Sequence, residues 1–195
     1  MTLRSKDKFF DLRNLSKQEI RALLVAALAK RERDWLMILV AYHHGLRVSE
    51  LLSIQTNDVR DGFLDVQRLK GSMRTVQPLM EDADPLLDER LKLVEYASKS
   101  TSGTPIFNLT RQRFYQIIQE HGKRAGIAAH KLFPHALRHS IASHVIHSAG
   151  IENTRQWLGH RSISSTGEYL KVSDEDASRA VISAVRGVGR SEKID

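Results

Sequence analysis

The sequence has no cysteine among its 195 residues. A chain without thiols has neither a disulfide framework nor a thiolate metal site. It also has no apolar run long enough to span a bilayer and no N-terminal apolar segment of the secretory type. These absences predict a cytoplasmic protein with no membrane partner.

Several motifs of nucleotide and metal chemistry are missing as well. The sequence contains no P-loop, no zinc-ligand spacing, no Gly-x-Ser-x-Gly turn and no glycine-rich nucleotide turn. Those motifs supply the phosphate cradle, the metal ligands or the activated serine that ATP, metal and acyl chemistry need. We therefore expect a function that uses no cofactor and no metal.

Acidic residues are outnumbered by basic ones. The chain has 30 Lys and Arg residues against 23 Asp and Glu residues, a formal net charge of +7 at pH 7. Such a balance favours polyanionic partners, because neutralising phosphates releases condensed counterions. The charge predicts a nucleic-acid partner, and a basic protein without such a partner stays open as the alternative.

Hydrophobic residues make up 41% of the sequence, which is ordinary for one globular domain. Apolar residues recur at helical spacing along most of the chain and alternate only in 63–69 and 73–79, around a short Gly-containing link. The predicted fold class is therefore mostly α with a small antiparallel β-sheet (α+β). Helices are expected after Ser16 and over 33–44, 48–54, 84–98, 110–125, 134–150, 153–158 and 163–172, with a last one from 173.

Local signals support several of these boundaries. Ser16 and Glu19 form a capping box, and Gly45 suits the end of the second helix. Thr110 and Asn153 are expected helix caps, and Pro134 fits a first helical turn. The helix over 84–98 depends on a weaker apolar pattern of Leu87, Leu91 and Val94.

Two arginines stand at expected helix starts. Arg138 follows His135 by three residues in a first turn, where the side chains share a face and free N–H groups favour an anion. Arg47 opens the helix over 48–54, and Glu50 lies three residues on, where its carboxylate could orient the guanidinium. The plainer alternatives are a solvated pair at 135 and 138 and a surface salt bridge between 47 and 50.

Lys70, His160 and Tyr169 complete the candidate set. Lys70 lies at the tip of the predicted hairpin, His160 follows a Leu-Gly turn, and Tyr169 follows a small polar run. Taken singly, a solvated lysine and a half-buried tyrosine are the commoner cases. Taken together with the arginines and His135, they indicate phosphoryl transfer. The arginines would neutralise a pentacoordinate phosphate, the phenol would attack it, and histidine and lysine would transfer protons.

At these residues the sequence resembles the tyrosine recombinase (phage integrase) family. The matching segments are His44-Gly45-Leu46-Arg47-Val48-Ser49-Glu50-Leu51-Leu52, the Lys70-Gly71 hairpin with Arg74 and Pro78-Leu79, His135-Ala136-Leu137-Arg138-His139-Ser140, Leu158-Gly159-His160 and Ser165-Thr166-Gly167-Glu168-Tyr169. Each segment is modest alone, and the ordered set is specific.

The resemblance implies a site-specific DNA recombinase that cleaves and rejoins strands through a 3′-phosphotyrosyl intermediate. It implies the following roles: Tyr169 as nucleophile, Arg47 and Arg138 as phosphate clamps, His160 as a further phosphate donor, Lys70 as acid for the 5′-oxygen, His135 as proton-transfer group and Glu50 as support for the site. The implied partners are double-stranded DNA and further copies of the chain, as a tetramer on DNA. The origin it implies is bacterial, archaeal or phage.

The resemblance also divides the chain into an N-terminal arm (1–12), a catalytic domain (13–172) and a C-terminal helix and tail (173–195). The last part resembles the family's protomer-docking segment. The chain begins almost where the family's catalytic domain begins, so we expect a catalytic fragment or a short recombinase like those of fimbrial switches. Two other functions stay open: a type IB topoisomerase-like nicking and closing enzyme, and a DNA-binding regulator without turnover.

Overall fold

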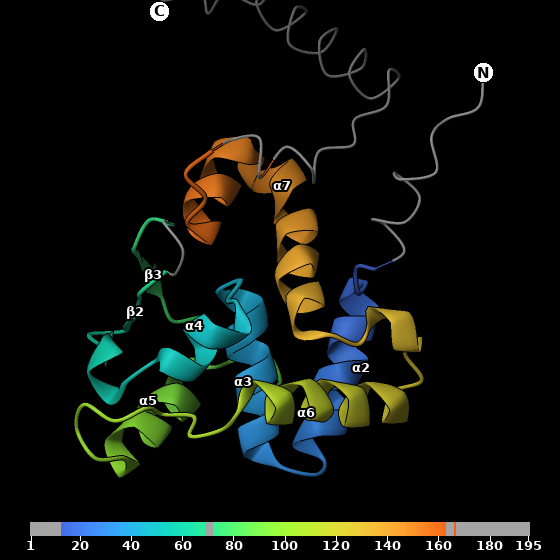
Figure 1. The fold of residues 1–195 in the computed structure, drawn as a ribbon, viewed down its shortest axis with the longest axis horizontal. Helices are drawn as coiled ribbons and strands as arrows, with labels where there is room; N and C mark the ends of the chain where they lie inside the picture. Colours follow the sequence, from blue (N-terminus) through green and yellow to red (C-terminus); the bar gives the residue numbers. More distant parts are fainter. Residues whose placement is uncertain (1–12, 69–71, 163–165, 167–195) are drawn as a thin grey trace, which may run out of the picture.

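Helix α3 (Glu32–His43) lies at the centre of the fold in the computed structural model, which describes residues 13–68, 72–162 and 166 (Figure 1). Every residue of α3 from 34 to 42 is buried, as expected for a helix covered on all sides. It packs against α2 (Lys17–Leu28), α4 (Val48–Ser53) and α7 (Pro134–Leu158). Helix α6 (Arg111–Arg124) packs on α2, α4 and α7 and closes the helical layer.

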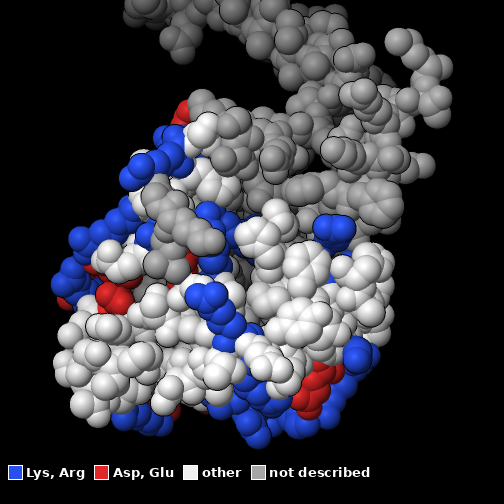
Figure 2. Space-filling model, in the orientation of Figure 1, with Lys and Arg blue, Asp and Glu red and all other residues white. Residues whose placement is uncertain are grey.

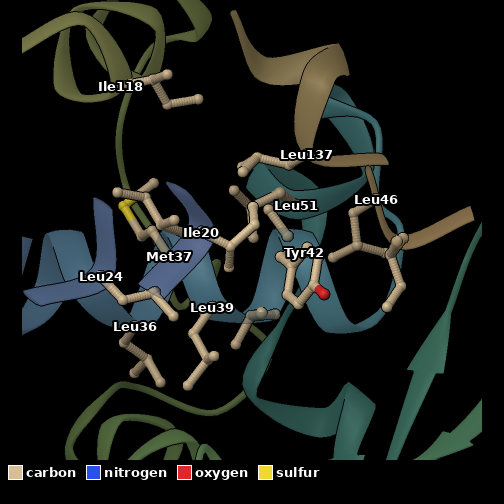
Figure 3. Packing of buried hydrophobic residues seen from close by; sticks show 14 of the residues in the cluster. Ile20, Leu24, Leu36, Met37, Leu39, Tyr42, Leu46, Leu51, Ile118 and Leu137 are labelled. Atoms are coloured by element: carbon tan, nitrogen blue, oxygen red, sulfur yellow. The ribbon is translucent and has the colours of Figure 1, made fainter. Parts of the chain in front are cut away.

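Leucine, isoleucine and methionine side chains from these helices form one core (Figure 3). The labelled members include Ile20 and Leu24 of α2, Met37 and Leu39 of α3, Leu51 of α4, Ile118 of α6 and Leu137 of α7. The core therefore joins α4 and the first half of α7, which carry the two candidate arginines, to one packed unit.

The expected helix starts are confirmed at three positions. The Ser16 hydroxyl accepts from the Glu19 N–H at 3.1 Å, and the Glu19 carboxylate accepts from the Ser16 N–H at 2.7 Å. Thr110 caps α6 through a 3.1 Å bond from the Arg113 N–H. Pro134 is the first residue of α7.

The predicted hairpin is confirmed and belongs to a three-stranded antiparallel sheet. Its strands are β1 (Val59–Arg60), β2 (Phe63–Val66) and β3 (Thr75–Pro78), in the order β1-β2-β3. Asp65 pairs with Val76, and Pro78 lies in an edge strand, as expected. The two-residue strand β1 was too short to be predicted from alternation.

The prediction for 84–98 was wrong at its start and in its buried face. Helix α5 spans Arg90–Lys99, and Leu91 and Val94 are 75% and 45% exposed, whereas Leu93 is buried. The preceding residues form a turn, because the Asp84 carboxylate accepts from the Leu86 N–H at 3.0 Å. A local side-chain bond of this kind competes with helix formation.

Helix α7 is broken at Gly150, as predicted, by a non-helical backbone (φ 82°, ψ 163°). Helical structure resumes at residue 151, so the expectation that Asn153 caps the second segment was wrong. The Asn153 amide instead donates to the Ala149 carbonyl at 2.7 Å. Two 3₁₀ turns, η1 (Thr56–Asp58) and η2 (Ala129–Lys131), complete the described elements.

Several predictions concern parts of the chain outside the described residues. They are the arm at 1–12, the helices expected at 163–172 and from 173, and the positions of Lys70 and Tyr169. Within residues 13–68 and 72–162, no helix has the length and apolar character needed to cross a membrane.

Candidate active site

A tight turn after α3 sets the position of Arg47. Gly45 adopts φ +56°, a conformation that side chains disfavour, and a Cβ atom there would lie 2.5 Å from the Leu158 side chain. The end of α7 therefore packs directly on this turn. Arg47 follows as the N-cap residue of α4, so its place is set by the turn and by the packing of α4 in the core.

Glu50 binds Arg47 twice. One carboxylate oxygen accepts from the Arg47 N–H at 2.9 Å, and the other accepts from the guanidinium Nη1 at 2.6 Å. Nη1 also donates to the Ser72 hydroxyl at 3.2 Å. The Glu50 side chain is fully buried and that of Arg47 is 29% exposed, so the pair is no surface salt bridge. One end of the guanidinium is fixed, while the side chain still reaches solvent.

Arg138 projects from the first half of α7 and is 1% exposed. It donates to the Gly45 carbonyl, to the Leu158 carbonyl at 2.9 Å and to His160 Nε2 at 2.7 Å. Its Nη1 atom lies 3.9 Å from a Glu50 oxygen. One arginine thus connects the turn before α4 with the turn after α7.

His160 lies beside Arg138 after a left-handed residue, Gly159 (φ +68°). Nε2 accepts a hydrogen bond from the arginine, which has no acceptor atom, so the ring proton must be on Nδ1. Nδ1 lies 3.0 Å from the Thr166 hydroxyl, which then accepts. His160 is therefore a neutral imidazole in a defined tautomer.

Charges in the site act in opposite directions on its acid and its base. Burial and the guanidiniums of Arg138, Arg47 and Arg68 lower the pKa of His160 to about 4. Burial alone would raise the pKa of Glu50, but the Arg47 N–H bond and the charge of Arg68 hold that pKa below its ordinary value. The site therefore holds a carboxylate and a neutral imidazole among cations.

His135 lies on the exposed side of α7, one turn before His139. The two rings meet edge to face, with centroids 4.3 Å apart. His135 is exposed to solvent on one side. Partial desolvation and the charges of Arg138 and Arg47 nevertheless lower its pKa below the usual value. Burial, and then the neighbouring His135 and the charge of Arg138, lower the pKa of His139 to about 4. A neutral His135 is suited to accept a proton.

The structure thus brings together Arg47, Glu50, Arg138 and His160 and places His135 within the field of the same arginines. Lys70 and Tyr169 lie outside the described residues, so their predicted roles remain predictions.

Sequence reasoning missed two members of this cluster. Arg68 is buried and donates to Glu50 at 3.1 Å, and Thr166 bonds His160. Leu64, Val66 and Arg68 alternate onto one buried face, and an arginine in that register calls for a buried acid. That signal was in the sequence for Arg68. No comparable signal existed for Thr166.

Within the described part of the chain, no group of three His, Asp or Glu side chains is arranged to hold a metal ion. Figure 2 shows Lys and Arg side chains in the middle of one face, in the region between β3 and α7 in Figure 1, and along its lower edge. Arginine is the side chain best suited to hold a phosphate group by paired hydrogen bonds. The arrangement is therefore suited to an anionic phosphate.

Comparisons with known proteins identify relatives of the chain. The model of the phage integrase family matches residues 13–176. The chain is 31% identical over 182 residues to tyrosine recombinase XerA of Pyrococcus furiosus, an alignment that covers 87% of this chain and 60% of that protein. It is 32% identical over 168 residues to type 1 fimbriae regulatory protein FimE of Escherichia coli K12, covering 80% of this chain and 84% of that protein.

A solved structure shares the fold. The crystal structure of XerA recombinase superposes with a TM-score of 0.68 and 25% identity over 92% of this chain and 65% of that chain. In the sequence comparison, the chain spans 60% of the length of the Pyrococcus XerA protein. The match of the family model over residues 13–176, together with the shared fold, shows that the chain belongs to the phage integrase family of tyrosine recombinases.

Proposed function

We propose that this protein is a site-specific DNA recombinase that cleaves and rejoins DNA strands through a covalent 3′-phosphotyrosyl intermediate, without metal or ATP. The observation that carries the proposal is the convergence of Arg47, Arg138 and neutral His160 around the buried Glu50 carboxylate. Two guanidiniums and an imidazole on a rigid, packed frame can stabilise the charge of a pentacoordinate phosphate.

Arg47 and Arg138 act as the clamp for the scissile phosphate. The Arg47 guanidinium is held by Glu50 through Nη1, and its partial exposure leaves donors for the non-bridging oxygens. Arg138 is held by two backbone carbonyls, so its guanidinium plane is fixed before substrate binds. Donors fixed in advance cost little reorganisation when charge develops on the phosphate.

His160 responds to the arrival of the phosphate. In the free protein its Nε2 atom accepts from Arg138. A bound phosphate would compete for that arginine donor and would favour a proton on Nε2, because an opposite charge nearby raises a histidine pKa. His160 then donates to the phosphate.

The remaining roles are assigned to Tyr169, Lys70 and His135. The Tyr169 oxygen attacks phosphorus and loses its proton to His135 or to solvent beside it, while the bond from phosphorus to the 5′-oxygen breaks. Lys70 gives a proton to that departing oxygen. Rejoining reverses these steps with a 5′-hydroxyl, so the phosphodiester bond energy is kept in the tyrosyl ester and no nucleotide cofactor is consumed.

The proposed partner is double-stranded DNA, bound by further copies of the same chain as a tetramer that aligns two sites. The net charge of +7 and the similarity to the tyrosine recombinase from Pyrococcus support DNA as the partner. We place the reaction in the cytoplasm, where the DNA lies.

A nicked suicide substrate tests the function. Cleavage near the nick releases a short fragment that carries the freed 5′-hydroxyl. Because this fragment diffuses away and cannot rejoin, wild-type protein should accumulate a covalent protein–DNA adduct that Tyr169→Phe does not form. Bound DNA without adduct would refute the enzymatic function. Strand exchange between two synapsed sites would then separate recombination from simple nicking and closing.

A further inference from the structure

Arg68 follows strand β2 and turns its side chain into the protein. The side chain is fully buried. Its Nε atom donates to the Thr75 hydroxyl at 3.2 Å, and Nη1 donates to Glu50 at 3.1 Å and to the Gly45 carbonyl at 3.4 Å. Nη2 donates to the backbone carbonyls of residues 44 and 157 at 2.9 and 2.8 Å.

These contacts use all five N–H groups of the guanidinium. No donor is left for a phosphate, because every N–H group of the guanidinium already has a protein acceptor. Arg68 therefore differs from Arg47, whose side chain is 29% exposed. Any role of Arg68 in the reaction has to be exerted through the groups it holds.

Glu50 is the group that connects Arg68 to the clamp. Its Oε2 atom accepts hydrogen bonds from Arg68 Nη1 and from the Arg47 backbone N–H. Its Oε1 atom accepts one from the Arg47 guanidinium. A buried carboxylate that loses one cation is destabilised in its charged form. Without Arg68, the Glu50 carboxylate would be less anionic and would lose one of the bonds that orient Oε2, so its hold on the Arg47 guanidinium would weaken.

The same guanidinium joins the strands to both turns of the site. It binds the turn at residues 44 and 45, and it binds residue 157 at the end of α7, where the Gly159 carbonyl also accepts from the Met73 N–H at 3.1 Å. Arg138 binds the same Gly45 carbonyl. The sheet, α4 and the end of α7 thus meet at Arg68.

We propose that Arg68 is a positioning residue of the strand-cleavage reaction, which holds the Glu50 carboxylate in place so that Glu50 keeps the Arg47 guanidinium aimed at the scissile phosphate. This inference rests on the proposed function. It adds to the clamp a third arginine that never touches DNA.

The test compares Arg68→Met with Arg68→Lys, and Arg90→Met is the matched control. Met removes the charge, Lys keeps it at about the same place, and Arg90 forms an exposed pair with Glu81. The rate of adduct formation on the nicked substrate is measured at saturating DNA between pH 5.5 and 8.5. DNA affinity and urea unfolding are measured beside it.

Arg68→Met should slow adduct formation about 10- to 100-fold, the usual cost of a misplaced catalytic group, with DNA affinity within about threefold of wild type. The deficit should grow as the pH falls, because the buried Glu50 would take up a proton. The charges that face Glu50 are Arg47, Arg68 and Arg138, and His135 and His160 feel its charge. Arg68→Lys should restore the wild-type pH profile at an intermediate rate.

Other results overturn the inference. If Arg68→Lys and Arg68→Met lose the same fraction of the rate of adduct formation at every pH, and if that loss follows their loss of stability in urea, Arg68 is purely structural. A loss confined to DNA affinity would make it a binding residue. If Arg68→Met does not fold, a wild-type rate or an altered pH profile in Arg68→Lys refutes the proposal. Failure of the wild type to form adduct refutes the proposed function itself, a result distinct from all of these.

Discussion

The turn at Gly159 gives the sharpest prediction about how the site is held together. Gly159 has φ +68°, and a Cβ atom there would lie 2.7 Å from the Met73 carbonyl oxygen and 2.9 Å from Arg68 Cγ. A left-handed backbone costs an L-residue about 1–2 kcal/mol. Overpacking against backbone adds about 1–3 kcal/mol, because the neighbouring chain has to shift.

Gly159→Ala should therefore lower the free energy of unfolding by about 2–5 kcal/mol. Gly126→Ala is the matched control, since Gly126 has φ +72° and no heavy atom within 4 Å of the added Cβ. It should lose only the backbone part, about 1–2 kcal/mol. Equilibrium urea unfolding followed by tryptophan fluorescence measures both, because Trp35 is buried and Trp157 is partly buried in the core.

The expected midpoint shift is about 1–2 M urea for Gly159→Ala and about 0.5 M for Gly126→Ala. Gly159→Ala should also slow adduct formation, because the turn carries His160. Equal losses of stability in the two variants would show that the sheet does not approach Gly159 closely and would refute the reasoning.

Further predictions concern charge. The pKa values of His139 and His160 are about 4 in the folded protein, below the ordinary value of 6.5, so the unfolded chain binds protons first as the pH falls. The free energy of unfolding should therefore be highest above pH 6.5 and should fall by on the order of 1 kcal/mol per pH unit toward pH 4. A free energy of unfolding in urea that stays constant over this pH range would contradict the lowered pKa values. Arg47→Ala should abolish adduct formation while DNA affinity falls only modestly, since its contact matters most in the transition state; a near wild-type rate of cleavage would show that Arg47 is not in the clamp. DNA affinity should fall steeply with salt in a titration between about 50 and 200 mM, and a salt-independent affinity would exclude phosphate contacts by the basic surface.

Much of the fold could be predicted from the sequence, because its signals are local. The Ser16 capping box, Thr110 and the glycines at 45 and 150 act on their own neighbours, and the structure shows them in those places. The predicted start of α5 was wrong because the Asp84 side chain accepts a hydrogen bond from its local backbone, and apolar spacing does not reveal such a bond.

The candidate site was predictable as a set of residues and less so as a network. Spacing predicted that Arg47 lies with Glu50 and His135 with Arg138. In the structure, Glu50 lies 2.6 Å from Arg47 and 3.9 Å from Arg138, and the catalytic roles stay predictions. The partners that hold them come from distant segments, such as Arg68 on Glu50 and the Leu158 carbonyl on Arg138. Contacts of that kind depend on tertiary packing, so no local pattern could give them.

The most direct test of the central claim is to find the residue that carries the DNA. Wild-type protein trapped on the nicked substrate is digested with protease and nuclease, and the modified peptide is sequenced by mass spectrometry. We expect a nucleoside 3′-phosphate esterified to Tyr169. A nucleotide phosphate esterified to another side chain, such as a serine within residues 162–165, would contradict the assignment of Tyr169 as the nucleophile.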